Sequence, residues 1–146
     1  MEPESVLAPE QVARVRATWL RLVPEADAML QTFYARLFEL DPSLRALFCH
    51  VRLPAQRQRL FEALQFIVSN LERPEALRTV LGELGARHLA YGARYEHYRL
   101  VGEALLWTLD EGLGEVDDAS RVAWAAAFDW VATLMLAGAR ARAPVG

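Results

Sequence analysis

Apolar and polar residues follow one another along this chain with a period close to a helical turn. Apolar positions recur at steps of three and four, and no stretch alternates strictly with β-branched residues between turn signals. Prolines and glycines interrupt the pattern at intervals, as residues that open and close helices do. We therefore predict an all-α fold with six long helices and one short helix.

These interrupting residues also set the bounds of the predicted helices. Pro9 and Pro54 each open a helix, Asp41 caps the short helix that Pro42 begins, and Gly92 closes a helix. The predicted helices span residues 9–23, 25–40, 42–48, 54–71, 75–91 and 95–113, and the last runs from Asp117 or Asp118 to residue 140. Because no linker, repeat or low-complexity tract separates them, we expect residues 1–146 to form one domain.

Composition and charge narrow the class of protein. Of the 146 residues, 53% are hydrophobic and 24% are charged, which excludes wholesale disorder, and the net charge of −3 disfavours nucleic acid as a partner. The lone cysteine, Cys49, excludes an internal disulfide framework. The amino-terminal segment is acidic without basic residues, unlike a secretory signal, and Asp129 interrupts the apolar stretch 122–139. We therefore expect a cytoplasmic protein with no membrane span.

Three polar side chains fall on otherwise apolar helix faces. His88 shares its face with leucines such as Leu84, Gln56 begins the face that continues at Leu60, and Tyr34 lies among aromatic and leucine residues. Taken singly, each has an ordinary interpretation: a histidine bonded to a backbone carbonyl, a glutamine at a helix end in solvent, a tyrosine packed in the core. Together they describe an apolar pocket with converging polar groups.

Two segments connect this pattern to a known family. They are TFYARLFELDPSLRALF, residues 32–48, and LGARHLAYGARYEHYRLVGEALL, residues 84–106. In the second, a histidine is followed ten residues later by a tyrosine and then by Val-Gly: His88, Tyr98, Val101 and Gly102. The sequence resembles the globins over nearly its whole length, in particular bacterial single-domain haemoglobins and the haem domain of flavohaemoglobins. The resemblance implies a globin fold built around a haem pocket.

The resemblance also implies a role for individual residues. His88 corresponds to the proximal iron ligand, Phe48 to the phenylalanine that stacks on the haem, and Tyr34 to the distal tyrosine of bacterial globins. Gln56 corresponds to the ligand-facing residue of the distal helix, with Leu60 as its apolar wall. The expected cofactor-binding residues are His88, Phe48, Tyr34, Gln56, Leu60, Leu84, Tyr98 and Val101, and the expected metal ligand is His88. Because C-x-x-C-H is absent, the expected cofactor is non-covalent haem b.

Further expectations concern the surroundings of this pocket. We expect a backbone carbonyl near Leu84 to fix the imidazole of His88. Seven apolar residues are expected to bury the macrocycle: Phe33, Phe38, Phe48, Leu60, Leu84, Val101 and Leu105. Arg59 and Arg87 are either partners of the haem propionates or solvated surface arginines. His50 and His97 are expected to have surface or structural roles.

The sequence departs from the flavohaemoglobin pattern in the last helix. Ala139 stands where the resemblance implies a glutamate bonded to Tyr98, and Phe128 stands where a tyrosine is frequent. In flavohaemoglobins this glutamate joins the proximal tyrosine and histidine in a hydrogen-bonded relay. We therefore expect the relay of Tyr98 and His88 to lack its carboxylate, and peroxide cleavage to be weak. The printed sequence stops after this helix, so we expect no flavin or nicotinamide domain.

The function that these residues and the resemblance imply is that of a haem b globin with bound iron. We expect it to bind oxygen, nitric oxide and carbon monoxide reversibly, as bacterial haemoglobins of the oxygen-binding and oxygen-transport kind do. Nitric oxide dioxygenation supported by a separate reductase is an activity that the sequence leaves open. The alternative is a globin-fold gas sensor or partner-regulating module without catalytic turnover.

Overall fold

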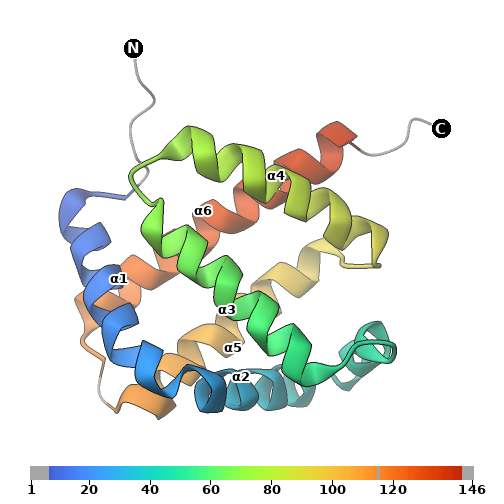
Figure 1. Ribbon diagram of the computed structural model, residues 1–146, viewed down its shortest axis with the longest axis horizontal. Helices are drawn as coiled ribbons and strands as arrows, with labels where there is room; N and C mark the ends of the chain where they lie inside the picture. The colour runs from blue at the N-terminus through green and yellow to red at the C-terminus, as the bar shows by residue number, and fades with distance from the viewer. Residues whose placement is uncertain (1–6, 115, 143–146) are drawn as a thin grey trace.

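The computed structural model describes residues 7–114 and 116–142, and within them every regular element is a helix (Figure 1). The elements in chain order are α1 (Pro9–Leu22), η1 (Val23–Glu25), α2 (Ala26–Leu40), η2 (Pro42–Phe48), α3 (Leu53–Ser69), α4 (Pro74–Ala90), α5 (Tyr95–Leu113) and α6 (Asp118–Arg142). The all-α prediction is confirmed. Residues 1–6, on which part of the argument about a secretory signal rests, lie outside the described residues.

Prolines and glycines bound the helices close to where the sequence predicts. Pro9, Pro54 and Pro74 lie in the first turns of α1, α3 and α4. Gly92 and Gly114 follow α4 and α5 with φ of 98° and 75°, conformations that side chains bearing a Cβ rarely adopt. The bounds therefore follow from local backbone chemistry.

Two short elements differ from the prediction. Residues 23–25 form a separate 3₁₀ turn, because Pro24 lacks the amide proton needed to continue the hydrogen bonding of α1. The segment 42–48 is also a 3₁₀ helix, and it is capped as predicted: the Asp41 carboxylate accepts hydrogen bonds from the backbone N–H of Ser43 at 3.0 Å and from its hydroxyl at 2.6 Å. The short helix is therefore wound more tightly than an α-helix.

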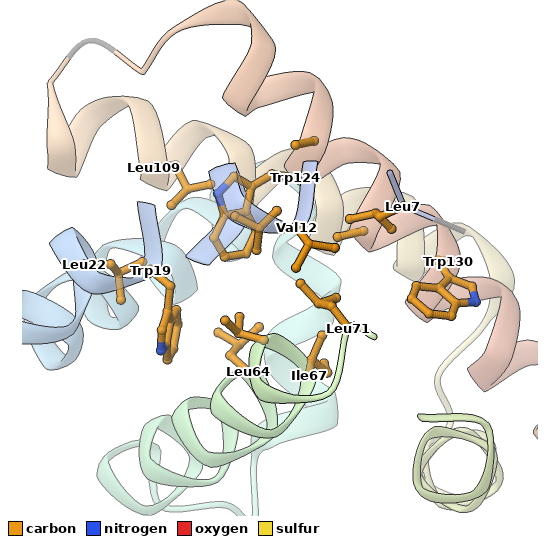
Figure 2. Packing of buried hydrophobic residues seen from close by; sticks show 14 of the residues in the cluster. Leu7, Val12, Trp19, Leu22, Leu64, Ile67, Leu71, Leu109, Trp124 and Trp130 are labelled. Atoms are coloured by element: carbon orange, nitrogen blue, oxygen red, sulfur yellow. The ribbon is translucent and has the colours of Figure 1, made fainter. Parts of the chain in front are cut away.

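The main hydrophobic core takes buried residues from all six α-helices, most of them from α1, α3 and α6, and Figure 2 shows part of it. Trp19 on α1 stacks on Phe61 on α3 with ring centroids 5.5 Å apart, and Trp124 on α6 packs against Phe128 at 5.6 Å. Trp124 and Trp130 are both buried. A second cluster, built mainly from α2, η2 and α5, contains Phe33 and Tyr34. These clusters hold the helices that form the site.

Helices α4 and α6 approach one another so closely that their backbones touch. A Cβ built on Gly85 would lie 1.9 Å from the carbonyl oxygen of Met135, and a Cβ on Gly138 would lie 2.2 Å from the Cα of Gly82. Only glycine fits at such a crossing, since any side chain would overlap backbone atoms. The backbone of α6 therefore sets the position of α4, which carries His88.

The expectation of no membrane span depends on helix α6. Its stretch Asp118–Ala141 is long and apolar enough to cross a bilayer by length and composition. In this structure a third of the tested stretch is buried, and the helix packs against α1, α4 and α5. The buried residues of α6, such as Trp124 and Met135, take part in the packing of the fold.

Candidate functional site

A single large cavity brings the predicted site residues together. Its volume is about 220 Å³, and its walls come from α2, η2, α3, α4, α5 and α6. All eight residues singled out from the sequence line it: His88, Phe48, Tyr34, Gln56, Leu60, Leu84, Tyr98 and Val101. The remaining wall residues are mostly apolar, so the cavity is a hydrophobic chamber with a few polar groups.

His88 presents one imidazole nitrogen to the backbone and leaves the other free for a ligand. Its Nδ1 lies 2.8 Å from the carbonyl oxygen of Leu84, one turn earlier on α4, which confirms the expected acceptor. Burial lowers the pKa of His88, the neighbouring Arg87 charge lowers it further, and the bond to Leu84 partly opposes them. The ring is therefore neutral at pH 7, with Nδ1–H donating to the carbonyl and the lone pair on Nε2.

Tyr34 and Gln56 form the polar pair contributed by α2 and α3. Tyr34 is 5% exposed, and its ring meets that of Phe48 edge to face with centroids 5.7 Å apart. Burial raises the pKa of Tyr34 and outweighs the neighbouring Gln56 amide and the charges of Arg59 and Arg57, all of which lower it. The hydroxyl therefore stays protonated and can donate, and Gln56 lines the cavity instead of pointing only to solvent.

Phe48 lines the cavity, whereas Phe38 lies behind it. The two rings meet edge to face at 5.6 Å, and the guanidinium of Arg45 lies 5.0 Å from the centre of the Phe38 ring. Phe38 is not among the wall residues, and its expected contact with a macrocycle stays a prediction. Helix α2 turns Phe33 and Tyr34 toward the chamber, and Phe38 holds Phe48 in place through aromatic packing.

The proximal side of α5 carries Tyr98 without a carboxylate partner. Burial alone raises the pKa of Tyr98, and no described carboxylate is hydrogen-bonded to its hydroxyl. Ala139 on α6 is 6% exposed and offers only a methyl group. The incomplete relay of His88, Tyr98 and a carboxylate stays a prediction.

His97 has a structural role, as expected, but it is also a wall residue. Its Nδ1 accepts the backbone N–H of Arg94 at 2.9 Å, which caps the start of α5, and its ring lines the cavity. Sequence reasoning also missed wall residues contributed by every helix from α2 to α6: Leu37, Leu44, Leu47, Ala63, Leu64, Ile67, Leu81, Ala93, Gly102, Phe128, Val131, Ala132 and Met135. Those on α6 recur at helical spacing, a pattern that indicates a shared face without showing what that face meets.

Comparisons with known proteins agree with this arrangement. A family model described as Globin matches residues 31–135. The flavohemoprotein of Bordetella pertussis is 34% identical over 139 residues, which cover 93% of this chain and 35% of that protein. The flavohemoprotein of Rhizobium meliloti is 36% identical over 124 residues, which cover 83% of this chain and 31% of that protein. The chain thus spans about a third of the length of the curated relatives it matches.

A solved structure shows the same fold. The bacterial globin from Campylobacter jejuni is similar with a TM-score of 0.82, covering 92% of this chain and 97% of that chain at 23% sequence identity. The helices that surround the cavity are therefore arranged as in that protein, and the fold expected from the resemblance is confirmed.

Proposed function

The chain belongs to the globin family, and from that premise we propose that it holds haem b in the cavity and reversibly binds oxygen and other diatomic ligands. The observation that carries this proposal is the state of His88. A neutral imidazole whose Nδ1 is bonded to the Leu84 carbonyl opens into a chamber that is otherwise largely apolar. This arrangement would suit an iron that is carried by a macrocycle and bound by the free nitrogen of His88.

The cavity walls fit such a planar apolar group. Phe48, Leu60, Leu84 and Val101 present hydrocarbon surface from four different elements. Burial of that surface holds a macrocycle without covalent attachment, and the lone cysteine, Cys49, rules out a C-x-x-C-H thioether site. These features support haem b.

When bound, haem supplies an iron that takes a diatomic ligand and passes electron density to it. The residues of this chain do the rest. The Leu84 carbonyl orients His88, the apolar walls exclude water, and Tyr34 and Gln56 supply hydrogen-bond donors to a ligand that gains negative charge. Such donors favour oxygen over carbon monoxide, because oxygen acquires more charge.

We also propose that the protein turns over nitric oxide with electrons from a reductase. Support comes from the curated relatives, whose printed name, flavohemoprotein, joins a flavin to a haem protein. Purified protein supplied with a reductant should consume nitric oxide in the presence of oxygen. Ligand binding without catalytic consumption would favour the sensor or partner-regulating alternative.

Absorption spectra of the purified protein test the haem proposal directly. The oxidised, reduced and carbon monoxide forms should show stoichiometric non-covalent haem with a histidine ligand, and His88→Ala should greatly weaken haem retention. The variant His97→Ala is the matched control, since this imidazole is a wall residue whose Nδ1 caps α5. Wild-type haem content and an unchanged ferrous spectrum in His88→Ala would refute the assignment of His88.

A further inference from the structure

Gly102 lies on α5 and lines the cavity, but it has no side chain to contribute to the site. Tyr98, Val101 and Leu105 line the same cavity from the same helix. Steps of three, one and three residues place these four positions on one face of α5. A side chain at position 102 would therefore point toward the cavity.

No contact within the described part of the chain requires glycine at this position. A Cβ built on Gly102 meets no heavy atom of that part within 4 Å, the two adjoining residues and the backbone of α5 aside. Gly85 and Gly138 differ, because a Cβ on either would overlap backbone atoms of the facing helix. Gly92 and Gly114 also differ, because their φ angles are positive and that of Gly102 is not. The packing of the protein itself therefore leaves this glycine unexplained.

Glycine at this position also weakens the helix. In the interior of a helix it is less favourable than alanine, because it loses more conformational freedom when the chain folds. Helix α5 is 19 residues long, and Gly102 lies well inside it, away from the residues that cap its ends. Alanine would strengthen the helix and overlap no other part of the chain. The glycine is explained if the space beside it belongs to a group that is not part of the chain.

We propose that Gly102 keeps α5 free of a side chain so that an edge of the macrocycle packs directly against the backbone of the helix. The inference rests on the proposed function, since it concerns the group held in that same cavity. The wall residues on either side, Val101 and Leu105, are apolar, so the edge that fits here carries the vinyl groups of haem b and not its carboxylates. A methyl group at position 102 would compete with that edge for the same space.

The decisive variant is Gly102→Ala, because it should act in opposite directions on the haem-loaded and the haem-free chain. Haem dissociation, measured by transfer to an excess of a haem-scavenging apoglobin, should accelerate by roughly ten- to a hundredfold. The melting temperature of the haem-free chain should instead rise by roughly 2–4 °C, because alanine is the better helix former. Opposite signs distinguish a conflict with the bound group from general damage to the fold.

A smaller macrocycle and a second glycine of α5 supply the controls. Deuterohaem carries hydrogen in place of both vinyl groups, so it leaves room for the new methyl group. Gly102→Ala should therefore retain deuterohaem as well as the wild-type chain does. Gly112→Ala makes the same replacement on the same helix outside the cavity wall, where the Cβ meets the side chain of Met29. It should leave the dissociation of haem and of deuterohaem unchanged.

Several results would overturn the inference. One is a Gly102→Ala protein that keeps haem as long as wild type does, and another is a loss that is equally large with haem and with deuterohaem. A haem-free Gly102→Ala chain that melts below wild type would show that the protein itself needs the glycine. Failure of the proposed function looks different, because the wild-type chain would then retain neither haem nor deuterohaem, and the inference would fall with it.

Discussion

The replacement Gly85→Ala tests whether the contact between α4 and α6 sets the position of His88. The new Cβ would lie 1.9 Å from the carbonyl oxygen of Met135 and 2.5 Å from its carbonyl carbon. The tightest ordinary Cβ contacts begin near 3.4 Å, so the two backbones have to separate by about 1.5 Å at this point. No side-chain rotation can relieve a contact with backbone, so α4 itself has to move.

The expected magnitude follows from two opposing effects. Alanine is the better helix former and stabilises an exposed helix interior by about 1 kcal/mol over glycine. Overpacking of a rigid core costs typically about 1–3 kcal/mol and occasionally more, and a backbone overlap belongs at the upper end of that range. We expect a net loss of about 2 kcal/mol in the free energy of unfolding, or a melting temperature lower by roughly 4–8 °C.

The assay combines urea unfolding with haem retention. Because His88 lies three residues beyond Gly85 on α4, the variant should also lose haem faster than wild type. Gly112→Ala is the matched control: its Cβ would meet only the Met29 side chain, the nearest atom being its terminal Cε at 2.7 Å, and that side chain can rotate away. Wild-type stability and haem retention in Gly85→Ala would refute the argument that this backbone contact positions His88.

Three further predictions concern the site. Tyr34→Phe removes a hydrogen-bond donor to a charged ligand. It should speed oxygen dissociation by roughly ten- to a hundredfold and change the affinity for carbon monoxide much less. If stopped-flow measurements show that Gln56→Leu speeds oxygen dissociation more than Tyr34→Phe does, Gln56 is the main donor and Tyr34 the secondary one. Ala139→Glu should raise the peroxidase rate, because the resemblance to flavohaemoglobins implies a carboxylate at this position that bonds Tyr98. A native peroxidase rate equal to that of a globin with this carboxylate would contradict the prediction. Burial holds the pKa of His88 below 6.5, so the unfolded chain binds a proton at His88 more readily than the folded chain does. The free energy of unfolding should therefore not depend on His88 above about pH 6.5 and should decline as the pH falls below that value. Unfolding of wild type and His88→Leu, measured over this pH range, checks the prediction.

The helices and their inward faces could be read from the sequence, because the interactions that determine them are local. A glycine with positive φ acts within a few residues, so the end of α5 before Gly114 is as predicted. The face that carries His88 depends on spacing within α4 alone, and its acceptor, Leu84, is only one turn away. The roles of Tyr34 and Phe48 came from the resemblance of their segment to the globins.

The relations between helices could be known only from the tertiary structure. Phe38 and Phe33 both looked inward on α2, yet Phe38 packs behind Phe48 and Phe33 lines the cavity. The glycines of α4 could be counted in the sequence, but that Gly85 touches the backbone at Met135 could not. Periodicity specifies which side chains share a face of one helix. Contacts between helices depend on how α2, α3, α4 and α6 are rotated and packed against one another, and non-local interactions determine that packing.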